Sequence, residues 1–399
     1  MAHEPLAAVR TLAPLITQHA DEAERARRLA RPVVEALVNA GVFRLLVPPV
    51  LGGAGASPLE FREVVETIAA VDGSTGWCVM ISGGYGQFAG LLPPAAATNI
   101  FRDAAAVLAG TFRPTGVARV VEGGYQVSGQ WPLASGSSHA AWLLGGCRVM
   151  EGDQPRRTPA GQPEWRLVFL PVSEAVILDT WHTAGLRGTA SNDFVLNNRF
   201  IPTHRTCWFT HAPARPEPLY RLPAVAVFAA WIASVPLGIA HHAIALFTAL
   251  AGAKTPTWSQ ALLREKTAAQ LAVGQAEGLV RAGRAFLTET LRDAWATVTG
   301  GTALSWEQRG LLWLASTQAA TQAVQAVELL FTAAGASAVY ASTGLERCLR
   351  DGRTAAQHLT VAPTNFEIAG QLALGLDVHQ SPWSIDDRGD GEDSSLLQT

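Results

Sequence analysis

The sequence carries little net charge and few cysteines, and both shortages exclude classes of protein. Its 399 residues have a formal net charge of −3, and Lys and Arg are not gathered into a basic stripe, which argues against a nucleic-acid partner. The four cysteines lie far apart and form no CxxC pair, so they indicate buried thiols rather than disulfides or a zinc site. No signal-peptide pattern opens the chain, and we expect a cytoplasmic protein.

Charge is also missing from one long segment, residues 224–253. Thirty such residues are long enough to cross a bilayer. The segment contains Pro236 and the pair His241 and His242, and neither an aromatic belt nor a cluster of positive charge flanks it. Because an alanine-rich helix that is apolar all round is also expected inside a bundle, we favour a buried helix, with no membrane span and no metal at the two histidines.

The remaining pattern divides the chain into three zones. Helical spacing runs to about residue 100, and short β-branched runs separated by turns follow from about Val107. Long helical patterns return after a proline-rich connection and continue to about Leu376, with one of the clearest over residues 345–361. We therefore predict a helical domain (1–105), a β-barrel domain (106–212), a helical bundle (213–380) and a disordered acidic tail (381–399).

Five stretches in this order resemble motifs of the acyl-CoA dehydrogenase superfamily. They are residues 72–77 (DGSTGW), 131–142 (WPLASGSSHAAW), 179–191 (DTWHTAGLRGTAS), 200–205 (FIPTHR) and 340–358 (YASTGLERCLRDGRTAAQH). The resemblance implies an α+β fold with an N-terminal helical domain, a central β-barrel and a C-terminal four-helix bundle.

One departure from the family selects a branch. Acyl-CoA dehydrogenases carry a catalytic glutamate about eight or nine residues after an Arg-Asp pair, here Arg350 and Asp351. That place holds Gln357 and His358, and no carboxylate follows until Glu367. A histidine there resembles the two-component (group D) flavin-dependent monooxygenases, such as phenol and hydroxyphenylacetate hydroxylases, dibenzothiophene monooxygenase and amino-sugar N-oxygenases.

This branch implies a specific chemistry. Exchangeable reduced FMN or FAD, supplied by a separate flavin reductase, would react with O2 as co-substrate to form a C4a-hydroperoxyflavin. That species would oxygenate a small organic molecule, aromatic or a natural product. Two alternatives remain open: an acyl-CoA dehydrogenase or oxidase with a relocated base, and a catalytically inactive helical assembly partner.

The resemblance also assigns catalytic roles. An imidazole ordinarily titrates near neutrality, so His358 could deprotonate the substrate or control the protonation of the peroxide; the alternative is an ordinary helix histidine. Ser135 is expected at the flavin N5 as a catalytic and cofactor-binding residue, with Ser137 and Ser138 as other candidates. Its alternative is simple turn chemistry with Gly136.

Further residues are expected around the flavin and the substrate. Thr111 and Trp181 would bind the flavin ring and Arg187 its phosphate, with packing or loop support as the alternatives. Trp77 and Tyr85 would line the substrate pocket. Tyr85 occupies a position where the family often has a histidine, so the family's usual simple phenolic substrate is in question.

The resemblance extends to assembly. Dehydrogenases commonly use an R-x-x-F-G motif to hold the FAD pyrophosphate across a subunit interface, and residues 254–258 (KTPTW) lack it. Its loss favours a loosely held flavin. The family's C-terminal bundle forms dimers that pair, so we expect a homotetramer, a dimer of dimers.

Overall fold

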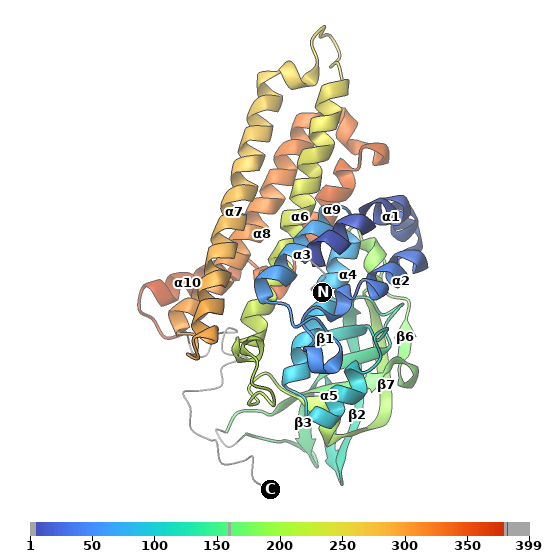
Figure 1. The fold of residues 1–399 in the computed structure, drawn as a ribbon, viewed down its shortest axis with the longest axis vertical. Coiled ribbons are helices and arrows are strands. Elements are labelled where there is room, and N and C mark those ends of the chain that lie inside the picture. The colour runs from blue at the N-terminus through green and yellow to red at the C-terminus, as the bar shows by residue number, and fades with distance from the viewer. Residues whose placement is uncertain (1–4, 159–160, 379–380, 382–399) are drawn as a thin grey trace.

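Two groups of helices flank a β-sheet in the computed structural model, which describes residues 5–158, 161–378 and 381 (Figure 1). The long C-terminal helices form the upper part of the molecule in this view, and the sheet lies below them. The predicted order of helices, strands and helices is confirmed. The predicted acidic tail lies outside the described residues, except for Ser381.

Two of the N-terminal helices, α3 and α4, begin at residues whose side chains accept hydrogen bonds from free amide groups. Ser57 accepts a hydrogen bond from the amide of Glu60, whose carboxylate accepts from the amide of Ser57 in return. Asp72 accepts from the amide of Thr75 at 2.7 Å. The helices are α1 (Pro5–Ala26), α2 (Arg31–Asn39), α3 (Pro58–Ala69), α4 (Gly73–Gly84) and α5 (Pro94–Phe101).

The sheet is mixed and open. Its strands are β1 (Leu108–Val121), β2 (Gly124–Ala134), β3 (Trp142–Glu151), β4 (Gln154–Pro155), β5 (Trp165–Pro171), β6 (Val176–Leu178), β7 (Asn192–Pro202) and β8 (Thr206–Cys207). They are ordered β6-β7-β2-β1-β3-β5-β8, with β4 beside β3, and β1 runs parallel to β3. The closed barrel that we predicted is not confirmed, because the short end strands β6 and β8 are not paired with each other within the described chain.

Trp131 on β2 is completely buried and packs against residues of neighbouring strands. Its ring stacks on Phe194 at a centroid distance of 4.8 Å, and its indole nitrogen donates to the carbonyl of Gly146 at 2.7 Å. A Cβ on Gly116 would lie 2.0 Å from this ring, so β1 can approach the tryptophan only without a side chain there.

The C-terminal region consists of α6 (Ala224–Ala253), α7 (Thr267–Thr299), α8 (Trp306–Ala334), α9 (Leu345–Ala355) and α10 (Thr364–Ala373). The three long helices α6, α7 and α8 pack side by side, and the shorter α9 and α10 lie against α8 (Figure 1). The helical pattern that we read through residue 361 ends earlier. Helix α9 stops at Ala355, and a short 3-10 turn at Leu359–Val361 follows.

Helix α6 is a core helix, as predicted. It is long and apolar enough to cross a membrane, yet 94% of its most apolar window is buried inside the protein. Trp231 donates to the carbonyl of Pro58 at 3.1 Å and meets the ring of Phe61 edge-on. Gly238 lets α6 approach α3 closely, since a Cβ there would lie 2.6 Å from the Cβ of Ala69.

Candidate active site

A cavity of about 260 Å³ lies between the sheet, α4 and the segment that follows α9. Residues from widely separated parts of the sequence form its wall. Six of the seven predicted site residues line this cavity: Trp77, Tyr85, Thr111, Ser135, Trp181 and His358. The seventh, Arg187, does not.

Helix α4 supplies one side of the wall. The helix begins at the Asp72 cap, and residues spaced by four positions then share a face. Trp77 and Ile81 lie on that face, and Tyr85 follows directly after the helix. The resemblance predicted two of these three residues; the helical spacing would have found Ile81 as well.

Ser135 belongs to a chain of hydroxyl groups. It lies in the turn after β2, because β2 ends at Ala134. The indole nitrogen of Trp77 donates to the Ser135 hydroxyl at 3.0 Å, and the hydroxyl of Ser191 lies 2.7 Å from it. Ser191 in turn lies 2.6 Å from the hydroxyl of Thr189.

The other two candidate serines are placed differently. The hydroxyl of Ser137 donates to the carbonyl of Ala190 at 2.7 Å and is buried away from the cavity. Ser138 is exposed, and its hydroxyl lies 3.5 Å from Nδ1 of His139. Of the three serines, the cavity therefore receives only Ser135.

His358 faces the cavity just after the end of α9. Its Nδ1 accepts a hydrogen bond from the amide of Thr360 at 3.3 Å, and the Thr360 hydroxyl lies 2.9 Å from the same atom. A nitrogen that accepts from an amide carries no hydrogen, so Nε2 carries it. Burial lowers the pKa of His358 to about 4, and the ring is therefore neutral at ordinary pH, with a donor on Nε2.

Aromatic side chains form the inner wall of the cavity. The ring of Tyr85 stacks on Phe228 at a centroid distance of 6.0 Å, and both residues are buried. The phenol donates to the carbonyl of Gly110 at 2.8 Å, and burial raises the pKa of Tyr85. Its hydroxyl is thus occupied within the protein, whereas its ring contributes an apolar surface.

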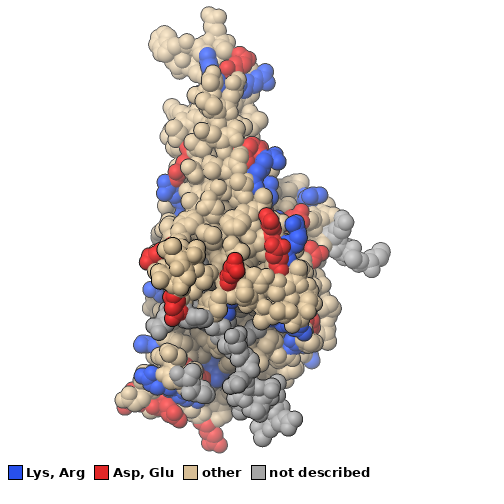
Figure 2. Space-filling view, turned by 90° about the vertical axis from the view of Figure 1, so that its left-hand side faces the viewer, with Lys and Arg blue, Asp and Glu red and all other residues tan. Residues whose placement is uncertain are grey.

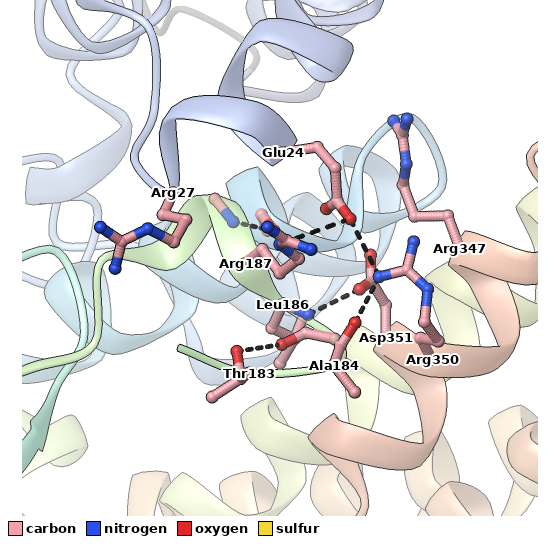
Figure 3. Close-up of polar contacts among 12 residues, drawn as sticks. Glu24, Arg27, Thr183, Ala184, Leu186, Arg187, Arg347, Arg350 and Asp351 are labelled. Carbon is pink, nitrogen blue, oxygen red and sulfur yellow. Dashed lines mark hydrogen bonds and ion pairs between the residues drawn. The ribbon is translucent and has the colours of Figure 1, made fainter. Parts of the chain in front are cut away.

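The loop before β7 forms part of the cavity wall, and hydrogen bonds from α9 hold this loop (Figure 3). The carboxylate of Asp351 accepts from the amide of Leu186, and Arg350 donates to the carbonyl of Ala184. The carbonyl of Leu186 accepts from the indole of Trp181 at 3.0 Å and from the Thr189 hydroxyl at 2.8 Å. These contacts hold Leu186 at a φ of +51°, a conformation that is unfavourable for a leucine.

Arg187 lies on the outer side of this loop. Its Nε is 3.8 Å from a carboxylate oxygen of Glu24 on α1 (Figure 3). The same nitrogen is buried and has no hydrogen-bond partner among the described residues.

Two polar features of the site escaped sequence reasoning. Ser191 lines the cavity and bonds to Ser135, although it lies within a motif that we quoted. A serine after an irregular loop gives no signal of which distant hydroxyl it will meet. Thr354 on the last turn of α9 and Gln357 just after the helix also line the wall, and their spacing of three would have been the signal.

A carboxylate base is missing from this wall. None of the described residues that line the cavity is Asp or Glu. Glu367, the next carboxylate in sequence, is exposed on α10. Removal of an α-proton by a relocated glutamate therefore has no support in this geometry.

Comparison with known proteins supplies the family. Residues 6–91 match the family model of the acyl-CoA dehydrogenase N-terminal domain, and residues 230–363 match that of the C-terminal domain. The indole-3-acetate monooxygenase of Pseudomonas putida is 32% identical over 89% of each chain. The flavin-dependent monooxygenase oxygenase subunit HsaA of Rhodococcus jostii (strain RHA1) is 28% identical over 92% of this chain and 97% of its own.

A solved structure agrees in fold. XiaF from Streptomyces sp., in complex with FADH2 and glycerol, superposes with a TM-score of 0.86 at 26% identity, covering 94% of this chain and 96% of its own. The cofactor of this family branch is thus a flavin. The chain belongs to the acyl-CoA dehydrogenase-like flavoproteins, in the branch of the flavin-dependent monooxygenases.

Proposed function

We propose that this protein is the oxygenase component of a two-component system that inserts one oxygen atom of O2 into a small aromatic molecule. Reduced FMN or FAD, delivered by a separate reductase, supplies the electrons that activate O2 when it is bound. The observation that carries the proposal is the cavity itself, whose described wall contains His358, Ser135 and aromatic side chains but no carboxylate.

The residues of the wall suit a reduced flavin. A flavin ring is flat and apolar on its faces, with polar atoms along its edge, and the cavity offers aromatic faces together with a few hydroxyl groups. Ser135 and Thr111 would meet the polar edge and Trp181 would pack on the ring. An open groove of about 790 Å³ shares Thr354 and Gln357 with the cavity, so a ligand too long for the cavity can extend along α9.

The shape of the inner wall favours a compact aromatic substrate. Behind Tyr85 and Phe228 lie Phe88 and Phe209, which are completely buried and packed against their neighbours. A long acyl chain would need room in that direction. Trp77 and Tyr85 would contact the substrate through their rings, and exclusion of water by these side chains would protect the activated oxygen from loss.

His358 would act on the oxygen chemistry as a neutral hydrogen-bond donor. Its Nε2 carries the hydrogen in the arrangement described above, so the resting ring can donate to an oxygen atom in the cavity. Deprotonation of a substrate by this ring, the other role that we predicted, requires the hydrogen to move to Nδ1 and the Thr360 amide to lose its acceptor.

The surface of the bundle supports association into the predicted homotetramer, a dimer of dimers. The side chains of Leu271, Leu311 and Trp258 are exposed there, and Trp258 is completely so. Figure 2 shows one face of the molecule on which the upper part of the bundle is mostly uncharged, with a few charges of both signs. Such a surface is typical of contacts between subunits. We place the enzyme in the cytoplasm, where reductases supply reduced flavin.

Rapid mixing tests the function directly. The protein, preloaded with reduced FMN without oxygen, is mixed with oxygenated buffer, and absorbance is followed. We expect a transient species whose spectrum differs from those of reduced and oxidised flavin, and its decay should yield a hydroxylated product from an indole or phenol added beforehand. Direct conversion to oxidised flavin with only hydrogen peroxide formed would disprove the proposal.

A further inference from the structure

Most polar side chains on the cavity wall direct their hydrogens into the protein. This holds for Trp77, whose indole donates to Ser135, and for Trp181, whose indole donates to the carbonyl of Leu186. The hydroxyls of Tyr85 and Thr354 likewise donate to backbone carbonyls. The wall is therefore poor in donors, and the direction of the remaining hydroxyl groups decides what Ser135 offers to a ligand.

The direction of the hydroxyl chain follows from its far end. Thr189 has one hydroxyl hydrogen and donates it to the carbonyl of Leu186 at 2.8 Å. It can then only accept from Ser191, so Ser191 donates to Thr189, and Ser135 donates to Ser191. Every hydrogen in the chain points away from the cavity.

Ser135 is left with a single free position. A hydroxyl has one hydrogen and two lone pairs. The hydrogen goes to Ser191, and one lone pair receives the indole hydrogen of Trp77. The second lone pair remains for a ligand, so Ser135 presents an acceptor. A reduced flavin carries a hydrogen on N5, whereas an oxidised flavin presents a lone pair there.

We propose that Thr189, a completely buried residue that does not line the cavity, makes the site selective for reduced flavin by fixing the direction of the hydroxyl chain. The inference rests on the proposed function, since it needs the flavin N5 beside Ser135. Reversing the chain would require Thr189 to turn its hydrogen away from Leu186 and to give up a buried hydrogen bond. Thr189 thus acts as a positioning residue through Ser191.

A pair of variants isolates this role. Thr189→Val keeps the shape of the side chain and removes the hydroxyl, so Ser191 loses its acceptor and can donate to Ser135 instead. Ser135 would then turn its hydrogen toward the cavity. Thr189→Ser retains the hydroxyl and is the matched control. The dissociation constants of reduced and oxidised FMN are measured for each protein, without oxygen, by fluorescence titration.

The wild-type protein should bind reduced FMN at least tenfold more tightly than oxidised FMN, because only reduced FMN can donate a hydrogen bond from N5 to Ser135. Thr189→Val should lower this ratio about tenfold, and Thr189→Ser should keep it within about threefold. The midpoint potential of the bound flavin should shift in parallel, by about 30 mV for each factor of ten. A loss of packing alone would weaken both forms equally and leave the potential unchanged.

Ser191→Ala provides a second test should Thr189→Val fold poorly. It removes the acceptor of the Ser135 hydrogen directly, so the ratio should fall here too. An unchanged ratio in a folded Thr189→Val or Ser191→Ala protein overturns the inference, as does equal binding of both flavins by the wild type; the proposed function would survive either result. A wild-type protein that binds no reduced flavin would overturn both.

Discussion

The carboxylate of Asp351 accepts a hydrogen bond of 2.6 Å from the amide of Leu186, which joins α9 to the loop that closes the cavity. Asp351 is completely buried, and burial raises the pKa of its carboxyl group to about 7. A folded protein that holds this proton more tightly than the unfolded chain loses stability as the pH rises. The loss begins near the unfolded pKa of about 4 and is complete above pH 7.

Asp351→Asn should remove this pH dependence. The amide oxygen can still accept from Leu186, whereas the buried charge is gone. We expect the free energy of unfolding of the variant, relative to wild type, to increase between pH 5 and pH 8, by up to about 3 kcal/mol. Urea denaturation at several pH values measures it. Asp351→Ala, which also loses the hydrogen bond, should be less stable than Asp351→Asn throughout, and parallel pH profiles for wild type and Asp351→Asn would contradict the buried charge.

Substitution of His358 distinguishes its two possible roles, hydrogen-bond donation to an oxygen atom and removal of a proton from the substrate. His358→Ala should lower the rate of product formation about a hundredfold and change flavin affinity little. His358→Gln retains a donor of similar reach and should recover part of the rate. Single-turnover measurements of hydroxylated product decide the matter. If the Gln and Ala variants are equally slow, the ring acts as a base.

The pH dependence of the same reaction follows from the low pKa of His358, about 4. The neutral ring is fully present above pH 5.5, so its titration should leave the rate flat from pH 6 to pH 8. The rate should fall only as the pH drops toward 4. An inflection near pH 6.5 that vanishes in His358→Gln would show that the ligand-bound ring titrates normally.

Tyr85→Phe should affect stability more than catalysis. The hydroxyl of Tyr85 donates to the carbonyl of Gly110, and its removal leaves that carbonyl without this partner. We expect a loss of about 1–3 kcal/mol in the free energy of unfolding with KM within a few-fold of wild type. A large rise in KM with unchanged stability would mean that the hydroxyl turns toward the substrate.

Arg187→Gln tests the predicted contact with the flavin phosphate, for which Arg187 would have to exchange its ion pair with Glu24, 3.8 Å from Nε. The variant should bind FMN about tenfold more weakly and riboflavin, which has no phosphate, as tightly as wild type. Arg353→Gln is the comparison, because Arg353 lines the open groove. A loss of FMN affinity in Arg353→Gln alone would place the phosphate along α9 and refute the Arg187 assignment.

The sequence predicted much of the site because its motifs contain the wall residues. His358 and Trp181 were named from short stretches in a fixed order, and both line the cavity. Their surroundings could not be predicted in the same way. The hydroxyl of Ser135 meets Ser191, 56 positions away, through an irregular loop whose left-handed residues Leu186 and Ala190 leave no pattern in the sequence.

The fold was predicted at the level of its zones for a similar reason. Hydrophobic spacing is a local property, and it indicates each helix and strand but not whether the sheet closes into a barrel. Closure depends on whether β6 and β8 can pair, and these strands have three and two residues. The pattern through residue 361 also hid the end of α9 at Ala355, since the short turn after it continues the same spacing.

The covered position of α6 has a consequence during synthesis. The ribosome completes Ala253 well before it adds α7 and α8, which pack against α6 in the finished protein together with the earlier helices α3 and α4. Through that interval α7 and α8 do not yet cover the thirty residues of α6. Such an apolar stretch is of the kind that chaperones and membrane-insertion machinery both recognise. We therefore expect variants that slow the packing of α8 against α6 to increase the share of chains that fail to fold.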